Sequence, residues 1–355
     1  MLEFYKGKTV LVTGATGFKG SWLSFVLSEA GANVIGYSLN PPTDPSLFAI
    51  GHISSRITNV IGDVRDFNHL LDVFQKYKPE IVFHLAAQPI VLTSYKEPRY
   101  TYETNVMGTV NVLEAARLAG CVKSLLNVTT DKVYENNNEP NHLFSENEKL
   151  DGYDPYSNSK SCSELVTHSY KNSFFGNTET KISTARAGNV IGGGDFSPNR
   201  IIPDCVRAVL SNEKIEVRNS LSTRPYQFVL EPLFAYLLIA KAQYENSSFS
   251  DYYNVGPDQV DAVTTGQIVD LFCSSWGGGA KWIDKTVTNA PHEASYLALD
   301  NSKLKQRLNW EPVYHIGKAV EKTVEWTKVF VTGDEEKVVE IMRKQISEFS
   351  KEFCK

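Results

Sequence analysis

The sequence has few cysteines, and they are scattered. Five occur in 355 residues, and no two of them form a Cys-x-x-Cys pair. An odd number of widely spaced cysteines argues against a disulfide framework and against a zinc site. We therefore expect reduced thiols, a cytoplasmic protein and no bound metal.

Long hydrophobic runs and an excess of positive charge are also missing. No apolar signal segment precedes the first expected strand, and no run is long enough to span a membrane. The 36 basic residues are outnumbered by 41 acidic ones, which gives a net charge of −5. That balance argues against a nucleic-acid partner but leaves room for a local basic pocket that binds a phosphorylated ligand.

The composition that is present is that of a globular protein. Hydrophobic residues make up 42% of the chain and charged residues 22%, which are ordinary values. Because the length exceeds one typical domain, we expect two lobes or one enlarged α/β domain.

Glycines at every third position follow the first expected strand. The apolar run 8–13 leads into Gly14-Ala15-Thr16-Gly17-Phe18-Lys19-Gly20, and the amphipathic stretch 21–30 comes next. Glycines let the backbone approach a diphosphate, and the N-terminus of the following helix faces its charge. The segment predicts a dinucleotide site rather than a purely structural turn.

The second strand, 33–38, lacks the acid that commonly reads the cofactor ribose. Ser38 or Asn40 stands in that region, and the next arginine is Arg56. Neither the NAD nor the NADP pattern is complete, but a 2′-phosphate would lack its usual guanidinium, so we favour NAD.

Two of the next three positions, Asp63 and Asn105, have two interpretations each. Asp63 follows an apolar run, where it either accepts a bond from the adenine amino group or caps the next helix. His84, in the apolar strand 80–88, is expected to be a core histidine. Asn105 either bonds neighbouring backbone and braces the site or is a plain helix-start residue.

The expected active site is split across two elements. Thr130, Asp131 and Lys132 end the strand 124–130, at the sheet edge where ligands of open α/β sheets bind. Asp154-Pro155 starts a helix as N-cap and first residue, and Tyr156 and Lys160 share one of its faces. An ammonium close to a phenol lowers the phenol pKa by about 1–3 units, as a tyrosine base requires.

Strands and helices alternate over the first half of the chain, and the alternation loosens afterwards. This predicts an α/β fold, a Rossmann-type doubly wound parallel sheet with a smaller mixed α/β C-terminal lobe for the substrate. We expect residues 1–185 to form the NAD-binding Rossmann domain, with 226–257 returning to it. Residues 186–225 and 258–355 are expected to form the substrate lobe and terminal helices. Three arginines within residues 200–224 suit a diphosphate there.

The motifs together resemble the extended short-chain dehydrogenase/reductase superfamily and, within it, the nucleotide-sugar 4,6-dehydratases. The resemblance covers roughly residues 8–312. The matching motifs are Gly14-x-x-Gly17-x-x-Gly20, Asp63, His84-Leu85-Ala86-Ala87, Asn105, Thr130 and Tyr156-x-x-x-Lys160. The longer segments 17–23, 129–132, 185–195, 224–225 and 229–233 are similar to the members of that family that act on CDP-glucose.

The resemblance implies a reaction on bound NAD that serves deoxysugar synthesis of the O-antigen type. The sugar is oxidised at C4 with Tyr156 as base, water leaves across C5 and C6, and hydride returns to C6. Thr130 would bind the 4-oxygen, and Lys160 would bind the nicotinamide ribose and lower the Tyr156 pKa. The implied partners are a nucleotide sugar, CDP-glucose by resemblance, and further copies of the chain in a homodimer or homotetramer. Such proteins pair through the helix after Asn105 and the Tyr156 helix.

The expected site residues fall into three groups. The catalytic group is Thr130, Asp131, Lys132, Tyr156 and Lys160. The cofactor group is Gly14, Thr16, Gly17, Phe18, Lys19, Gly20, Ser38, Asp63, Val64, Leu85, Ala86, Ala87, Asn105, Tyr156 and Lys160. The substrate group is Gln88, Asn189, Arg200, Arg218 and Arg224.

Lys132 departs from the wider dehydratase pattern, in which a glutamate follows the aspartate. Family analogy makes Asp131 the acid and Lys132 the base, but their ordinary pKa values, about 3.9 and 10.4, favour the reverse. We therefore hypothesise that Lys132 is the acid or an electrostatic stabiliser, with Asp131 or Glu135 as base. A third interpretation is a plain salt bridge between Lys132 and Asp131.

Two other functions fit parts of the sequence. A nucleotide-sugar C4 epimerase needs Tyr156 and Lys160 but no acid–base pair after Thr130. A non-catalytic dinucleotide-sensing protein could share the fold, although such proteins can lose the tyrosine or lysine that is present here.

Overall fold

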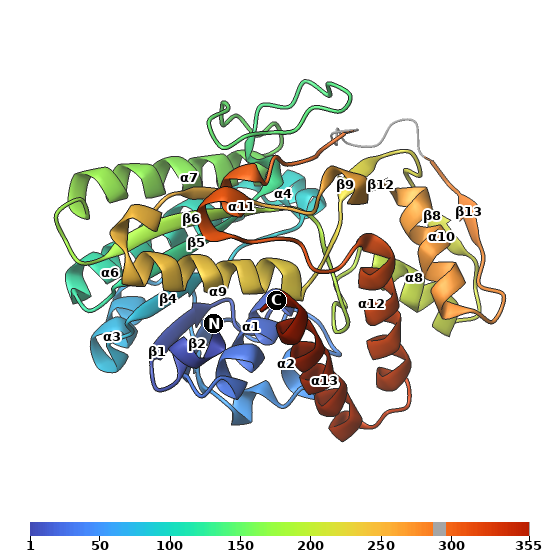
Figure 1. Ribbon diagram of the computed structural model, residues 1–355, viewed down its shortest axis with the longest axis horizontal. Helices are drawn as coiled ribbons and strands as arrows, with labels where there is room; N and C mark the ends of the chain where they lie inside the picture. Colours follow the sequence, from blue (N-terminus) through green and yellow to red (C-terminus); the bar gives the residue numbers. More distant parts are fainter. Residues whose placement is uncertain (287–295, 355) are drawn as a thin grey trace.

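The computed structural model describes residues 1–286 and 296–354, and its centre is a parallel sheet of seven strands (Figure 1). The strands lie in the order β11-β6-β5-β4-β1-β2-β3. Their bounds are β1 Thr9–Thr13, β2 Asn33–Ser38, β3 Thr58–Ile61, β4 Ile81–His84, β5 Ser124–Thr130, β6 Lys181–Ala187 and β11 Tyr252–Val255. The order reverses between β1 and β4, which places a ligand crevice at that edge. The predicted Rossmann-type sheet is confirmed.

Helices cover both faces of this sheet and leave its central strands buried. Val10 and Val12 belong to the larger hydrophobic core, whereas Leu11 belongs to the core on the other face. Alternate residues of a strand point to opposite faces, so a strand buried on both sides is continuously apolar. The flanking helices are α1 Phe18–Glu29, α2 Leu47–Ile50, α3 Phe67–Tyr77, α4 Val91–Lys96, α5 Pro98–Tyr102, α6 Gly108–Ala119, α7 Pro155–Phe174 and α9 Leu230–Glu245.

The segment after residue 226 rejoins the sheet. β11 pairs in parallel with β6 at the sheet edge, and α9 packs against β5 and β6. α9 returns to the sheet although it is far from β5 and β6 in the sequence. Most of its residues are buried, and a helix that is apolar all round must pack against other elements on every side. The domain boundaries themselves stay a prediction.

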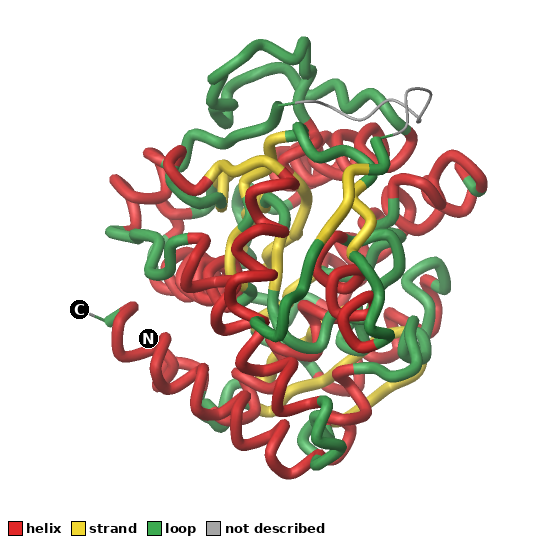
Figure 2. Tube along the Cα trace, turned by 90° about the vertical axis from the view of Figure 1, so that its right-hand side faces the viewer, coloured by secondary structure: helices red, strands yellow, loops and turns green. Residues whose placement is uncertain are grey.

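Most of the remaining elements form a smaller mixed region beside the sheet (Figure 1), on the side that faces the viewer in Figure 2. Its strands pair two by two: β7 Val190–Ile191 with β10 Gln227–Phe228, β8 Ile215–Val217 with β13 Trp282–Asp284, and β9 Thr223–Pro225 with β12 Ala262–Thr264. Its helices are α8 Ile201–Leu210, α10 Thr265–Trp276 and α12 Ile316–Phe330, whereas α11 Ser302–Leu308 packs against β11 and α9. The sequence predicts a turn over 223–227, which is wrong, because Arg224 and Val263 pair across an antiparallel ladder.

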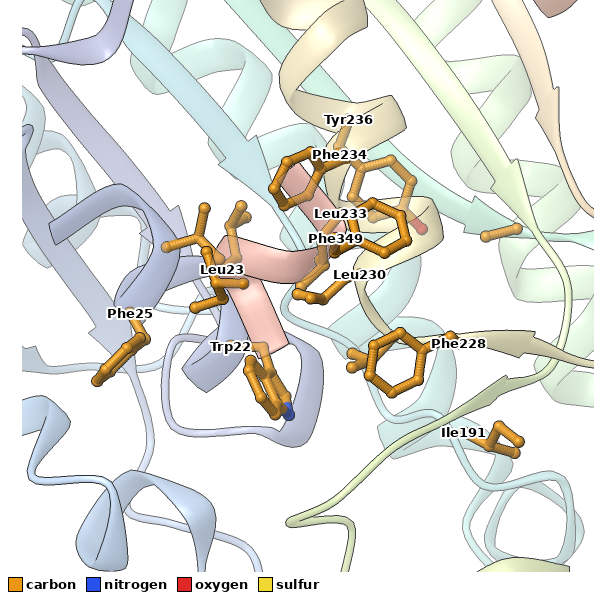
Figure 3. Packing of buried hydrophobic residues seen from close by; sticks show 14 of the residues in the cluster. Trp22, Leu23, Phe25, Ile191, Phe228, Leu230, Leu233, Phe234, Tyr236 and Phe349 are labelled. Atoms are coloured by element: carbon orange, nitrogen blue, oxygen red, sulfur yellow. The ribbon is translucent and has the colours of Figure 1, made fainter. Parts of the chain in front are cut away.

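The last helix, α13 Glu335–Phe353, is more buried than its charge suggests. The sequence predicts a charged helix with a solvated face over 335–355, and the structure has such a helix, whose other face buries Val338, Met342 and Phe349. Phe349 packs edge-on against Phe234 of α9 with ring centroids 4.9 Å apart (Figure 3). Only one face of α13 is therefore solvated.

The described residues contain no helix with the length and hydrophobicity of a membrane span.

Candidate active site

The glycine turn after β1 is packed too tightly to admit side chains. Gly14 has φ +74°, and a Cβ there would lie 2.8 Å from the Ala86 nitrogen. A Cβ on Gly20 would lie 2.0 Å from the Gly14 oxygen. The backbone before α1 is thus bare, and the first turn of the helix opens at the carboxyl edge of the sheet. This geometry fits a dinucleotide diphosphate.

Ser38 and Thr16 bond within the turn. The Thr16 amide donates to Ser38 Oγ over 3.3 Å, and Thr16 Oγ1 donates to the Leu39 oxygen over 2.9 Å. Their side chains therefore hold the β1 and β2 ends together. Arg56 is used elsewhere, because its guanidinium bonds Glu29 at the far end of α1 over 2.8 Å.

Asp63 does not cap the helix that follows it. The N-cap of α3 is Asp66, whose Oδ1 accepts from the His69 amide. The Asp63 carboxylate takes two bonds from the Arg65 Nε and one from its Nη2, and this guanidinium lowers the pKa of the carboxyl group. The capping interpretation is wrong. Asp63 lines a cavity of about 420 Å³, and the neighbouring Val64 packs under Gly108.

His84 is a core histidine, as predicted. Its Nδ1 lies 2.8 Å from Thr13 Oγ1 and its Nε2 lies 3.2 Å from Thr109 Oγ1. Burial lowers its pKa to about 3, with a smaller contribution from Lys160, so the ring is neutral. The half-buried residues after it, 85–87, line the edge of the sheet beside the glycine turn.

Asn105 braces the site, and the plain helix-start interpretation is wrong. The helix already runs from Pro98, and Asn105 lies in a single π-helical turn, Glu103–Met107, before α6. Its Oδ1 accepts from the Gln88 amide over 2.8 Å, and its Nδ2 donates to Ser159 Oγ of α7 over 2.9 Å. π turns often mark functional sites.

Gln88 is occupied inside its own loop. Its Nε2 donates to Thr101 Oγ1, and its Oε1 accepts from the Ile90 amide. The sequence predicts a substrate contact for this side chain, but in this arrangement its amide orders the loop after β4.

The helix α7 begins as predicted and delivers the tyrosine and lysine to the end of β5. Asp154 Oδ1 accepts from the Ser157 amide over 3.0 Å, and Pro155 is the first helical residue. Lys160 Nζ donates to the Val128 oxygen over 3.1 Å, and the Tyr156 phenol bonds the Thr130 hydroxyl.

The sequence predicts that Lys160 lowers the pKa of the Tyr156 phenol, but burial and other groups set this pKa in the structure. Burial raises the pKa of Tyr156 to about 12, the Thr130 hydrogen bond lowers it, and Asp131 raises it further. The cation that lowers it in this structure is Arg200. Burial also lowers the Lys160 pKa to about 8. Desolvation therefore outweighs the pair interaction that spacing along α7 suggests.

Asp131 and Lys132 form a salt bridge that faces Tyr156 and Thr130. The fully buried Asp131 accepts at Oδ1 from Thr130 Oγ1 over 2.7 Å and from Lys132 Nζ over 3.0 Å. Lys132 Nζ also donates to Asn189 Oδ1 over 3.1 Å. Within residues 1–286 and 296–354, Asp131 Oδ2 has no hydrogen-bond partner, so a buried acceptor remains for a ligand.

Glu135 does not belong to the site. Its carboxylate bonds Lys149 Nζ over 2.8 Å, and its side chain is 44% exposed. The hypothesis that it is an alternative base is wrong, because the chain turns outward after the short helix that holds Asp131 and Lys132.

The predicted arginines are not gathered at one point. Arg200 stands at the N-cap position of α8, donates to Asp195 Oδ2 over 2.9 Å and lowers the pKa of Tyr156. Arg218 is largely exposed and bonds Asn199 and Asp204. Arg224 is buried and donates to the Thr223 oxygen. The structure thus brings Asn189 and Arg200 to the catalytic groups and places Arg218 at the surface.

Three features of the site were not anticipated. Glu164 and Arg186 form a buried ion pair beneath it. The Lys19 amine, predicted only as a cofactor contact, lies over the Tyr236 ring, and burial and neighbouring cations lower its pKa to about 7. Tyr236 itself, on α9, has a buried hydroxyl without a hydrogen-bond partner among the described residues. Spacing could have found Glu164, one helical turn after Lys160.

Comparison with known proteins agrees with this geometry. The family model for GDP-mannose 4,6 dehydratase matches residues 11–323. The CDP-glucose 4,6-dehydratase of Salmonella typhimurium is 46% identical over 339 residues, which cover 94% of both chains. A UDP-glucose 4-epimerase of Mycolicibacterium smegmatis is 27% identical over 322 residues, which cover 89% of this chain and 97% of that protein.

Solved structures share the fold at low identity. A dTDP-glucose 4,6-dehydratase from Bacillus anthracis has a TM-score of 0.75 at 22% identity, covering 91% of this chain and 97% of its own. A UDP-glucose-4-epimerase from Stenotrophomonas maltophila has a TM-score of 0.80 at 20% identity, covering 92% and 100%. These structures show the same fold, and the family model and the 46% identical relative show that the chain belongs to the nucleotide-sugar 4,6-dehydratases of the GDP-mannose 4,6 dehydratase family.

Proposed function

We propose that the chain is an NAD-dependent CDP-glucose 4,6-dehydratase, a hydro-lyase that converts CDP-glucose to CDP-4-keto-6-deoxy-glucose and water. The observation that carries this proposal is the buried Asp131–Lys132 pair beside Thr130 and Tyr156. Oxidation alone needs only the tyrosine and lysine, whereas elimination of water also needs an acid and a base. The 46% identity to the Salmonella enzyme supports the choice of cytidine.

The cofactor fits the turn before α1 without a side chain in its way. NAD, when bound, supplies a positively charged ring that accepts hydride from sugar C4 and returns it to C6. Gly14, Gly17 and Gly20 give its diphosphate access to the backbone. NAD is preferred to NADP because Arg56 is engaged by Glu29 and the end of β2 has no other guanidinium for a 2′-phosphate.

Tyr156 is the group that takes the proton of the sugar 4-hydroxyl. Thr130 bonds both the phenol and Asp131 Oδ1, so it holds the reacting oxygen between the oxidation and elimination groups. A phenol with a pKa of about 12 is a poor base at neutral pH, so the positive charge of Arg200, which lowers this pKa, is needed when the substrate enters.

The elimination is assigned to Asp131 and Lys132 in the order that their ordinary charges favour. Asp131 keeps Oδ2 without a partner in the described part of the chain, and a carboxylate oxygen of that kind can accept the C5 proton. Lys132, held between Asp131 and Asn189, then donates to the leaving 6-oxygen or stabilises its charge.

The nucleotide part of the substrate is assigned to the mixed region. Asn189 and Arg200 already lie at the catalytic groups, and Arg218 and Arg224 extend the positive charge away from them along β8 and β9. Arg218 is the more accessible of the two for a diphosphate, because Arg224 is buried.

We also propose that the chain forms a homodimer or homotetramer through α6 and α7. Fourteen large apolar side chains are exposed among residues 1–286 and 296–354, and seven of them lie between Leu92 and Leu118 or on α7: Leu92, Tyr95, Tyr102, Met107, Leu118, Leu165 and Phe174. Apolar side chains gathered in this way favour association.

A panel of CDP-, dTDP-, UDP- and GDP-glucose tests the function. We expect only CDP-glucose to give the base-induced absorbance of a 4-keto-6-deoxy sugar and a product lighter by one water. Tyr156→Phe is the inactive control. A product of unchanged mass would instead mean an epimerase, and no reaction with any nucleotide would favour a dinucleotide-binding protein.

A further inference from the structure

Three side chains of α7, one helical turn apart, meet three consecutive residues of β5. The pairs are Tyr156 with Thr130, Lys160 with Val128, and Glu164 with Thr129. The first two pairs belong to the proposed active site. The third is directly below them, and the proposed reaction gives it no role.

Glu164 is buried and its carboxylate is completely used. Its Oε1 accepts from Thr129 Oγ1 over 2.5 Å, and its Oε2 accepts from Thr184 Oγ1 over 2.8 Å and from Arg186 Nη2 over 3.0 Å. Both members of the ion pair are almost inaccessible, at 1% and 3% exposure. A buried ion pair often stabilises a fold no better than apolar residues of the same volume. We therefore look for a role of the Glu164–Arg186 pair other than stabilising the fold.

Arg186 extends the pair to the segment that follows the catalytic aspartate and lysine. Its Nη1 donates to the Tyr134 hydroxyl over 2.8 Å and to the Glu146 oxygen over 3.0 Å. The ion pair thus links α7, β5, β6 and the loop after Lys132 at one buried point.

Lys160 lies within the field of this carboxylate. Its amine is buried, which lowers its pKa to about 8, and Glu164 is the charge that opposes this lowering. The other titratable groups coupled to Lys160 are Lys19 from the glycine turn, which is a like charge, and His84 from β4, which is neutral. Glu164 is therefore the group that favours an ammonium at this position.

We infer that Glu164 is a positioning residue of the active site: it fixes the register of α7 on β5 and keeps Lys160 in its ammonium form. This inference rests on the proposed function, which gives Lys160 its role beside Tyr156 and the cofactor ribose. Arg186 balances the Glu164 charge and holds the neighbouring loop.

Two substitutions that break the same ion pair should move the titration of Lys160 in opposite directions. Glu164→Gln removes the negative charge, so we expect the Lys160 midpoint to fall by about one pH unit. Arg186→Met removes the positive charge and leaves the carboxylate, so the midpoint should stay or rise. The ¹³Cε resonance of Lys160, assigned from its loss in Lys160→Met, reports the midpoint directly.

The same opposition should appear in turnover. A lower Lys160 midpoint means that the ammonium is lost earlier as pH rises, so the alkaline fall in activity should move to lower pH in Glu164→Gln only. Thr184→Val is the matched control, because it removes one hydrogen bond to Glu164 without changing a charge. It should lower the melting temperature and leave both midpoints in place.

The outcomes separate positioning from mere stability. If Glu164→Gln does not fold, the double variant Glu164→Gln/Arg186→Met removes the unpaired charge, and its Lys160 midpoint should still lie below that of the unmodified protein. An unchanged Lys160 titration midpoint in Glu164→Gln, or in the double variant if Glu164→Gln does not fold, would overturn the inference. Failure of every nucleotide sugar to react would refute the proposed function alone, because the resonance needs no substrate.

Discussion

At the scale of single residues, Asp131 and Tyr236 are the buried side chains that say most about where a ligand binds. Each is fully buried, and each has one polar atom without a hydrogen-bond partner in residues 1–286 and 296–354. Tyr236 is electrostatically coupled to Tyr156 and Asp131, so both atoms belong to the neighbourhood of the site. Buried polar atoms are normally satisfied, and such exceptions are common where a ligand binds.

Asp131→Asn and Lys132→Met should separate the two proton transfers. We expect Asp131→Asn to lose exchange of the C5 hydrogen with solvent deuterium by about 100-fold or more, since a general base contributes that much. Lys132→Met should keep exchange and lose release of water. Mass spectrometry of substrate and product in deuterated buffer measures both. If only the lysine variant loses exchange, the assigned roles are reversed.

Tyr236→Phe should leave the free energy of unfolding unchanged or slightly raise it. The substitution removes a buried hydroxyl that bonds no described residue, so no hydrogen bond is lost on the protein side. Tyr5→Phe is a matched control, because its buried hydroxyl donates to the Leu237 oxygen on the same helix over 2.6 Å.

We expect the Tyr5 control to lose about 1 kcal/mol in urea unfolding. An equal loss in Tyr236→Phe would mean that its hydroxyl is already satisfied in the free protein.

At the scale of elements, the glycine turn and the α7–β5 contact depend on close approach rather than on polar bonds alone. The third glycine of the turn sits on the backbone oxygen of the first, so α1 can start only where both lack side chains. The π turn before α6 also depends on its surroundings, because it places Asn105 where its side chain bonds both Gln88 and Ser159.

Gly20→Ala should damage the turn far more than Gly17→Ala. The new methyl group of the first variant would lie 2.0 Å from the Gly14 oxygen, whereas that of the second would lie 3.4 Å from it. We expect Gly20→Ala to lose about 1–3 kcal/mol of stability through overpacking and to be purified without NAD. Thermal unfolding and the absorbance of released cofactor measure these effects. Equal behaviour of the two variants would contradict the tight turn.

At the scale of the whole molecule, the mixed region is tied to the sheet at several buried points. Trp22 Nε1 of α1 donates to the Gly193 oxygen over 2.9 Å, and α12 of the mixed region packs against α13, whose Phe349 packs on Phe234 of α9. The larger hydrophobic core continues from β1 through α9 to α12 and α13. The catalytic groups therefore sit between parts that are held together by one core.

Charges placed on α6 or α7 should separate the proposed subunits. Leu118→Lys and Leu165→Lys change side chains that are 49% and 55% exposed, so the monomer fold should tolerate them. We expect light scattering to give half the mass or less for the double variant. Leu221→Lys, at a position 84% exposed in the mixed region, should leave the mass unchanged. A double variant of unchanged mass would place the interface elsewhere.

Features that depend on neighbours along the chain could be predicted from the sequence. The strand 124–130, the Asp154 cap, the bare glycine turn and the shared face of Tyr156 and Lys160 all follow from local periodicity and backbone preference. Four features could be seen only once the chain had folded: the π turn at Asn105, the exposed position of Glu135, the raised Tyr156 pKa and the ion pair of Glu164 with Arg186. These features depend on burial and on charges far apart in the sequence, and neither is set until the sheet and its helices close around them.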